Sequence, residues 1–247
     1  MVASRTHTSM QLTRSIMEVP DAEQGEGRAR ALVLGGVLLC GGRSLRMGTD
    51  KARLLLDGVS LLECTAALLR EVCGSVVLAC GEEPRYVERG LPLVLDGPQP
   101  APDPARSAGP LAGLVAGLEA LGTELTLAIA CDMPRLERGL LEALGQRARE
   151  ERLDACFLSS ERGREPLCAV YSRRCVEPMR RALAAGRRRV TAFLDEGGFD
   201  LRVGELPLEE LERQGVLSPA QLEGVLTNLN TPQELEVERA RRVEGGS

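Results

Sequence analysis

The stretch LCGGRSLRMGTDK, residues 39–51, directly follows the apolar run of residues 33–39. A buried strand that opens into a glycine-rich, basic loop has the parts needed to hold a nucleoside triphosphate. The spacing fits neither a P-loop, which ends in Gly-Lys-Ser/Thr, nor the Gly-x-Gly-x-x-Gly loop of dinucleotide-binding folds. An ordinary strand followed by a solvated basic turn is the alternative interpretation.

Each residue type in this stretch has a chemical use. Gly41 and Gly42 lack a Cβ atom, so backbone N–H groups can approach an anion closely there. Arg43 and Arg46 can grip phosphate oxygens in pairs, whereas Lys51 supplies a compact charge on a flexible stem. Together these cations can offset the charge of a triphosphate.

Short apolar runs alternate with longer segments of helical periodicity, which indicates a parallel sheet with helices on both faces. The expected strands are residues 33–39, 76–80, 93–95, 125–131, 155–158 and 167–171. The expected helices are residues 61–72, 111–121, 140–150, 174–185 and 232–242. Ligands of such sheets bind beyond the carboxyl ends of the strands, and residues 39–51 begin at one of those ends.

Composition favours a single domain over residues 31–247. With 247 residues and 43% hydrophobic content, the chain can bury a substantial core. The net charge of −5 and an aromatic content of 2% argue against nucleic-acid binding. No apolar run approaches the roughly twenty residues of a membrane span. Residues 1–30 are expected to be a disordered leader, with a transit peptide or a start codon placed too far upstream as alternatives.

The cysteines and the single histidine restrict the chemistry. The eight cysteines form no C-x-x-C pair and mostly lie in apolar runs, so we expect reduced core residues and a cytoplasmic protein, with a catalytic cysteine as the alternative. The only histidine, His7, lies in the polar leader, which removes most triad, general-base and zinc chemistry. Catalysis must therefore rest on carboxylates, cations and metal.

Two aspartates follow expected strands at the ligand edge of the sheet. Asp132 can hold Mg²⁺ against triphosphate oxygens, or it can cap the helix that follows Met133 and Pro134. Asp96 directly follows the run of residues 93–95 and so lies at the same edge. It can also be no more than a turn residue before Gly97.

Residues 39–51 resemble the signature loop of Rossmann-like nucleotidyltransferases, in the form Leu-x-Gly-Gly-x-Ser-x-Arg-Met-Gly-x-Asp-Lys of the molybdenum cofactor guanylyltransferase family. Further similarities are Gly-Pro-Leu-Ala-Gly at 109–113, Cys-Asp-x-Pro at 131–134, the Pro-Leu run at 163–167, Gly-x-Arg-Arg-Val at 186–190 and Asn-x-Asn-Thr-Pro at 228–232. The resemblance spans residues 33 to 239, so the leader lies outside it.

The resemblance implies a three-layer α/β fold of the Rossmann-like nucleotide-diphospho-sugar transferase type, with a mainly parallel sheet. It implies transfer of GMP from Mg²⁺-bound GTP to the terminal phosphate of molybdopterin or its molybdenum form, with release of pyrophosphate. Molybdoenzymes or their chaperones are candidate partners. The implied catalytic residues are Arg46, Lys51 and Asp132, with Asp132 as the Mg²⁺ ligand. The implied GTP-binding residues are Leu39, Cys40, Gly41, Gly42, Lys51, Asp96 and Asp132.

The resemblance also assigns three residues to the acceptor side. Arg164 is a candidate contact to the acceptor phosphate, with a solvated hairpin tip as the alternative. Arg188 belongs to an arginine run that can meet a second anion or simply be solvated surface. Asn230 can cap the last helix, line the site, or do both.

One departure leaves the nucleotide open. The family tends to have a polar group near the base where this chain has residues 79–82, Ala-Cys-Gly-Glu, whereas the Gly41-Gly42 pair favours guanine over the Ala-Gly of cytidylyl-transferring relatives. The alternatives are a cytidylyltransferase or another nucleotidyltransferase of the same fold, and a non-catalytic nucleotide-binding protein.

Overall fold

The chain is described over residues 33–40, 50–97 and 109–245 in a computed structural model. The leader expected over residues 1–30 and the loop residues Gly41, Gly42, Arg43 and Arg46 lie outside these described residues.

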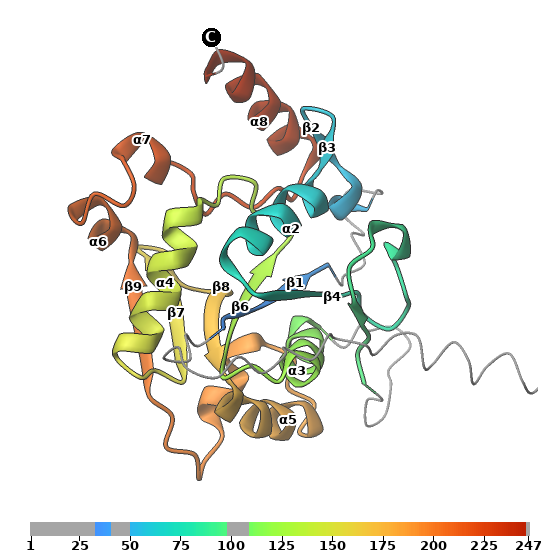
Figure 1. The fold of residues 1–247 in the computed structure, drawn as a ribbon, viewed down its shortest axis with the longest axis vertical. Coiled ribbons are helices and arrows are strands. Elements are labelled where there is room, and N and C mark those ends of the chain that lie inside the picture. The colour runs from blue at the N-terminus through green and yellow to red at the C-terminus, as the bar shows by residue number, and fades with distance from the viewer. Residues whose placement is uncertain (1–32, 41–49, 98–108, 246–247) are drawn as a thin grey trace, which may run out of the picture.

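A seven-stranded sheet crosses the molecule in the order β5-β4-β1-β6-β8-β7-β9 (Figure 1). Its strands are β1 (Gly35–Leu39), β4 (Ser75–Ala79), β5 (Leu93–Val94), β6 (Leu125–Ala130), β7 (Ala155–Ser160), β8 (Gly163–Ser172) and β9 (Val203–Pro207). β8 pairs antiparallel with β6 and β7, whereas all other pairs are parallel. The expectation of a mainly parallel sheet is confirmed, and β8 begins four residues earlier than expected.

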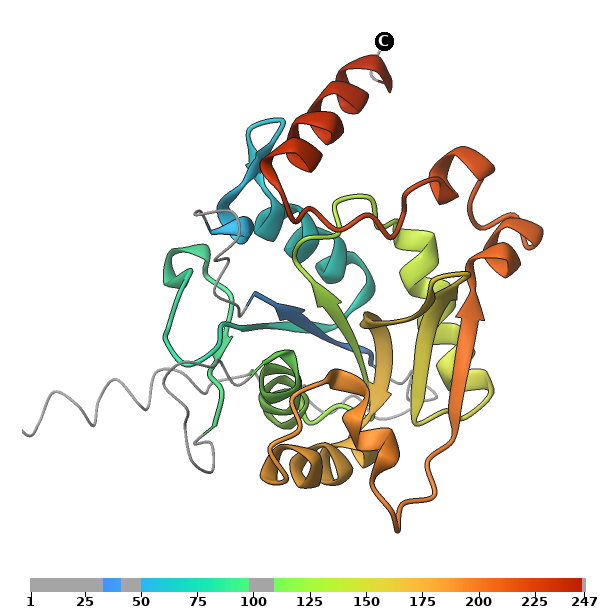
Figure 2. The same ribbon diagram turned by 180° about the vertical axis from the view of Figure 1, so that it is seen from behind.

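Helices cover both faces of the sheet (Figures 1 and 2). The helices are α2 (Leu61–Val72), α3 (Pro110–Leu121), α4 (Arg138–Glu150), α5 (Val176–Ala184), α6 (Leu208–Arg213), α7 (Pro219–Leu222) and α8 (Pro232–Gly245). α2 and α4 pack on one face, and α3 and α5 pack on the other. The three expected layers are therefore present. The segment expected as one helix over residues 174–185 is a 3-10 turn followed by α5.

The central strands are apolar throughout because both of their faces are buried. In β1, Leu38 packs in the core beneath α2 and α4, whereas Val37 and Leu39 pack against the α3 side. All three are 7% exposed or less. A continuous apolar run rather than an alternating one is the pattern of a strand covered on both faces.

Local signals fix the helix ends. Ser60 and Glu63 form a reciprocal capping box at the start of α2, and Pro110 occupies the first turn of α3. α3 ends at Gly122, whose φ of 59° lies in the left-handed region. Gly117 lets α3 approach β1 closely, because a Cβ atom there would overlap with the side chain of Val37.

The C-terminal helix α8 lies beside a small hairpin outside the main sheet (Figures 1 and 2). The hairpin consists of β2 (Leu55–Leu56) and β3 (Val59–Ser60), paired antiparallel. A separate apolar cluster joins the two regions and consists of Leu56, Leu61, Leu229 and Leu235. This cluster brings the segment before α8 to the same side of the molecule as the start of α2.

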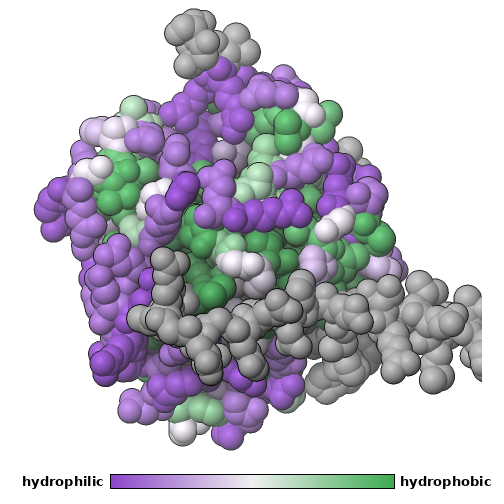
Figure 3. Space-filling model, in the orientation of Figure 1, coloured by the Kyte–Doolittle hydropathy of each residue, from purple (hydrophilic) through white to green (hydrophobic). Residues whose placement is uncertain are grey.

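Hydrophilic residues dominate the rim of the face in Figure 3, around a central group of apolar ones. Within the described ranges, no helix combines the length and apolar character needed to cross a membrane. All eight cysteines are free thiols, and all but Cys64 are buried, so seven of them are core residues as expected.

Candidate active site

The candidate site lies at the carboxyl edge of the parallel strands β1, β4 and β6. These strands pair in register, so the residues that follow them, Cys40, Cys80 and Cys131, are neighbours at this edge. Burial raises the pKa of Cys80, and a hydrogen bond with Cys131 together with burial raises that of Cys40. Thiols that stay protonated are poor nucleophiles, so neither supports the alternative of a catalytic cysteine.

Three of the residues that the sequence singled out meet at this edge. Lys51 begins the 3-10 turn η1 (Lys51–Arg53), and its Nζ lies 3.3 Å from Asp132 Oδ2 and 2.5 Å from Asn230 Oδ1. The side chains of Lys51 and Asp132 are 19% and 20% exposed, so both can meet a ligand from solvent. Lys51 is also the only lysine in the chain, which otherwise uses arginine for its cations.

Asp132 follows β6 and does not cap a helix. α4 begins at Arg138 with Glu137 at its N-cap position, so the capping interpretation of Asp132 is wrong. Its backbone oxygen accepts a hydrogen bond from the N–H of Leu229 at 2.9 Å, which fixes the main chain. No described residue donates a hydrogen bond to Asp132 Oδ1, whereas Oδ2 pairs with Lys51.

Asn230 faces Lys51, and its neighbour caps the last helix. Thr231 Oγ1 accepts the N–H of Glu234, and the Glu234 carboxylate accepts the N–H groups of Asn230 and Thr231 at 2.6 and 2.8 Å. The Asn230 side chain is thereby free to accept from Lys51. Nearby in sequence, Asn228 Oδ1 is buried without a hydrogen-bond partner among the described residues. The segment thus presents an unused acceptor oxygen.

Asp96 follows β5 and lies against the first turns of α3. Its Oδ1 would be 3.5 Å from a Cβ atom placed on Gly113, so a small residue there lets the helix approach the carboxylate. Burial, and then the negative charge of Glu82, raises the pKa of Asp96 to about 6. A carboxyl group with a pKa raised by burial at a sheet edge is typical of a ligand-binding position.

Glu165 is a second carboxylate near Asp132 that sequence reasoning missed. Burial raises its pKa, a hydrogen bond from the Leu167 N–H opposes this, and the charge of Asp132 adds to the rise. Glu165 lies in the run of residues 163–167, directly beside Arg164, and an acidic residue in that run is its only sequence signal.

The two candidate acceptor arginines make contacts with other parts of the fold. Arg164 Nε donates to Glu205 Oε1 at 2.6 Å, and its guanidinium carbon lies 5.4 Å from the centre of the Phe157 ring. Arg188 lies beside the start of α3, where its backbone oxygen would be 3.2 Å from a Cβ atom on Gly109. Arg164 is therefore already paired, and it lies near the carboxyl end of β7.

The carboxylates fit a magnesium site that is completed by substrate. Within the described ranges, no cluster of three or more metal-ligating side chains occurs. Mg²⁺ usually keeps several waters and is bound through one or two carboxylates plus substrate phosphates. Asp132, with one carboxylate oxygen that receives no donor from the described residues, fits that requirement.

The arrangement suits electrostatic stabilisation of transferring phosphate. A compact cation, a carboxylate and an amide side chain converge at the ligand edge of the sheet. No histidine occurs among the described residues, so the chemistry available here is binding, charge neutralisation and orientation.

Comparisons with known proteins identify the family of this chain. The family model described as the MobA-like NTP transferase domain matches residues 36–198. A protein of Chloroflexus aggregans named probable molybdenum cofactor guanylyltransferase is 38% identical over 165 residues, covering 64% of this chain and 75% of that protein. The molybdenum cofactor guanylyltransferase of Desulfosudis oleivorans is 32% identical over 202 residues, covering 81% of this chain and 92% of that protein.

Solved structures show the same fold. Molybdopterin-guanine dinucleotide biosynthesis protein A from Archaeoglobus fulgidus superposes with a TM-score of 0.68 at 22% identity, covering 85% of this chain and all of that one. A 2-C-methyl-D-erythritol 4-phosphate cytidylyltransferase from Thermus thermophilus gives 0.55 at 18% identity, covering 83% and 97%. The expected nucleotidyltransferase fold is confirmed.

Proposed function

The chain belongs to the MobA-like NTP transferase family, and on that premise we propose that it transfers GMP from GTP to the terminal phosphate of molybdopterin or its molybdenum form. The observation that carries the proposal is the meeting of Lys51, Asp132 and Asn230 at the carboxyl edge of the sheet. The similarity to proteins named molybdenum cofactor guanylyltransferase supports this choice of donor and acceptor.

In this proposal the glycine-rich stretch and Lys51 hold the triphosphate. Leu39, Cys40, Gly41, Gly42, Arg46, Lys51, Asp96 and Asp132 form the GTP side, as the resemblance implies. Arg164, Arg188 and Asn230 are assigned to the acceptor side. The Arg164 ion pair with Glu205 would have to open before Arg164 could meet an acceptor phosphate.

The reaction is an in-line displacement at phosphorus. An oxygen of the acceptor phosphate forms a bond to the α-phosphorus of GTP, and the bond from that phosphorus to the β-phosphate oxygen breaks, so that pyrophosphate leaves. The acceptor phosphate is already ionised, so no general base is required. Lys51 neutralises charge on the triphosphate, and Asp132 is the residue that would hold the metal ion beside it.

Mg²⁺ is the proposed metal, held by Asp132 and the phosphates. When bound, it would neutralise the charge that develops on the phosphate oxygens. Asp132 would hold the metal through Oδ1, which receives no hydrogen bond from the described residues, while Oδ2 is paired with Lys51.

We further assign the activity to a single domain over residues 31–247 in the cytoplasm, with molybdoenzymes or their chaperones receiving the product. The eight free cysteines support a reducing compartment.

Calorimetric titration with GTP, CTP, ATP and UTP, with and without Mg²⁺, tests the donor. We expect GTP to bind selectively and more tightly with Mg²⁺. Preference for CTP would redirect the proposal to a cytidylyltransferase, and the absence of binding by any nucleotide would contradict a transferase role.

The metal assignment is tested with Asp132→Asn, assayed for guanylyl transfer to molybdopterin. We expect turnover to be abolished while the thermal unfolding temperature stays near that of the wild type. Asp200→Asn is the matched control, because Asp200 is exposed and precedes β9, at the opposite end of the sheet. Normal turnover of the Asp132 variant at limiting Mg²⁺ would remove Asp132 from the metal site.

A further inference from the structure

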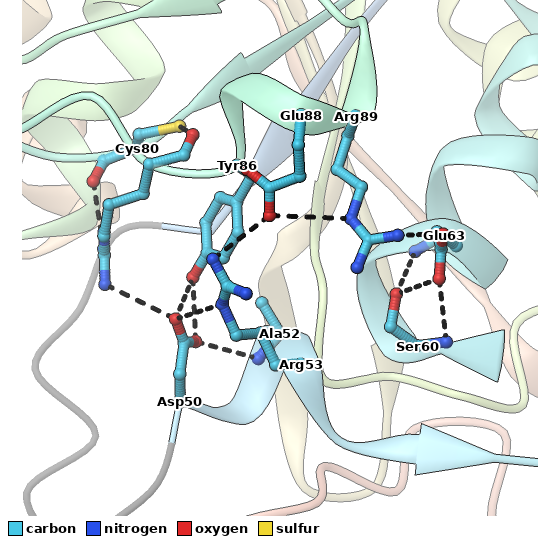
Figure 4. Close-up of polar contacts among 10 residues, drawn as sticks. Asp50, Ala52, Arg53, Ser60, Glu63, Cys80, Tyr86, Glu88 and Arg89 are labelled. Carbon is cyan, nitrogen blue, oxygen red and sulfur yellow. Dashed lines mark hydrogen bonds and ion pairs between the residues drawn. The ribbon is translucent and has the colours of Figure 1, made fainter. Parts of the chain in front are cut away.

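The segment between β4 and β5 is connected by side chains to the residues on either side of the glycine-rich stretch (Figure 4). The pairs are Arg85 with Cys40 and Asp50, Tyr86 with Asp50, Glu88 with Arg53, and Arg89 with Glu63. Residues 85–89 thus contact both the end of β1 and the turn that carries Lys51. Neither the sequence nor the family resemblance pointed to this segment.

Tyr86 is the most constrained of these residues. It is 2% exposed, and its backbone has a φ of 64° and a ψ of 26°, the left-handed conformation that non-glycine residues seldom adopt. Its hydroxyl group donates to the Asp50 carboxylate, at 2.8 Å from Oδ1 and 2.6 Å from Oδ2. Burial and the neighbouring Asp50 both raise the pKa of Tyr86, so the hydroxyl remains a donor.

Asp50 connects the Tyr86 hydroxyl group to the turn that carries Lys51. Its Oδ1 also accepts the N–H of Ala52 at 3.2 Å, which caps the short turn η1, and Lys51 is the first residue of that turn. The position of the Asp50 carboxylate therefore sets where the Lys51 side chain begins. From there Nζ reaches Asp132 and Asn230.

Arg85 connects the same turn to the sheet. Its guanidinium donates to the backbone oxygen of Cys40 at 3.1 Å and to that of Cys80 at 3.0 Å, and it lies 4.0 Å from Asp50 Oδ2. The guanidinium carbons of Arg85 and Arg53 each lie 5.5 Å from the centre of the Tyr86 ring. The ends of β1 and β4 and the Asp50 turn are thus held by one planar donor group and one buried ring.

We propose that Tyr86 and Arg85 are positioning residues for Lys51, which hold the Asp50 turn against the ends of β1 and β4 so that the ammonium group is presented to the nucleotide. The effect on GTP rests on the proposed function. The effect on Lys51 itself follows from the contacts alone and is measured without nucleotide.

The test uses Tyr86→Phe, which removes the hydroxyl group and keeps the ring. Because Lys51 is the only lysine, its acylation by an amine-reactive ester can be followed by mass spectrometry of the peptide that contains it. We expect acylation in the nucleotide-free variant to be severalfold faster. We expect the Kd for Mg²⁺-bound GTP to rise about tenfold, which corresponds to about 1.4 kcal/mol.

Tyr171→Phe is the matched control, since the chain has two tyrosines. The Tyr171 hydroxyl donates to the Pro166 oxygen at 2.6 Å, so its loss also removes a buried hydrogen bond. We expect this variant to lose stability while acylation of Lys51 and the Kd for GTP stay at the wild-type values. Comparison of the two variants therefore separates an effect on the position of Lys51 from a general loss of stability.

Wild-type acylation kinetics or a wild-type Kd for GTP in Tyr86→Phe would overturn the inference. If the wild-type protein binds no GTP, the proposed function fails, and the acylation rates alone decide whether Tyr86 positions Lys51. Should Tyr86→Phe not fold, Arg85→Gln provides the same test, because it removes the planar donor that joins Cys40 to Cys80.

Discussion

At the scale of single residues, the shape of the Lys51 side chain matters as well as its charge. A compact ammonium group lies between a carboxylate and an amide oxygen, in a chain whose other side-chain cations are all arginines. Arginine's planar fork has a different reach and a different donor geometry, so the two residues are not interchangeable here. The single lysine therefore indicates a requirement of the site.

We expect Lys51→Ala to weaken GTP binding by about 1.5–3 kcal/mol, the range for hydrogen bonds to charged groups. Lys51→Arg should recover only part of this loss, although it restores the charge. Calorimetric titration with Mg²⁺-bound GTP measures both variants. An unchanged affinity in Lys51→Ala would remove the residue from the site.

Asp96→Asn should stabilise the protein in a pH-dependent manner. The pKa of Asp96 is raised from 3.8 to about 6, so the folded state holds this proton more tightly than the unfolded state does. Ionised Asp96 therefore destabilises the fold, fully above pH 6 and not at all below pH 3.8. The gain in urea-unfolding free energy of the variant over the wild type should grow between these values and then level off. A gain that is constant with pH would contradict the shift.

The residues of the site differ in how far the sequence could predict them. Lys51, Asp132 and Asn230 were singled out because each lies in a short motif, and the structure brings them within hydrogen-bonding distance. Tyr86 carries no such signal. Its importance depends on a left-handed backbone and on a contact 36 positions away in the chain, which local patterns do not encode.

At the scale of elements, α3 depends on its glycines for its distance from the sheet. Gly117→Ala would place a Cβ atom within the space of the Val37 side chain, which is β-branched and cannot turn away easily. We expect a loss of about 1–3 kcal/mol in unfolding free energy, measured in urea. Gly197→Ala is the control, since a Cβ atom there meets nothing within 4 Å.

Most elements could be predicted from their hydrophobic patterns, and the exceptions have physical causes. α2 has the bounds that its periodicity predicts, and the structure adds a capping box at its start. β9 was missed because VGELP offers only a short, partly exposed pattern with a glycine and a proline. It is a strand because its backbone completes the edge of the sheet beside β7 and because Gly204 packs closely on Leu153.

At the scale of the whole molecule, a buried ion pair fastens α8 to the segment that follows Asp132. Glu238, with a side chain only 3% exposed, pairs with Arg135 at 2.6 Å and with Arg242 at 3.3 Å. Arg242 also donates to the backbone oxygen of Pro134 at 3.0 Å. These contacts hold the backbone of the segment that directly follows Asp132.

We expect Glu238→Gln to cost about 1.5–3 kcal/mol of unfolding free energy, because Arg135 loses its charged partner and Arg242 keeps only its pair with Asp57 among the described residues. Glu236→Gln on the same helix is the control. Glu236 is 69% exposed and pairs with Arg239 at the surface, so its loss should cost less than about 1 kcal/mol. Equal effects in urea unfolding would show that the Arg135 pair does not fasten α8.

The contact between Lys51 and Asn230 spans 179 positions of the chain. A polypeptide emerging from the ribosome can begin to assemble β1, β4 and β6 before Asn230 has been translated, since domains tend to fold from the N-terminal side. The oxygen that meets Lys51 arrives only 179 residues after the lysine itself. The protein therefore acquires a complete binding edge only once this segment has been made, and a chain that stops before it can contain the motif without the site.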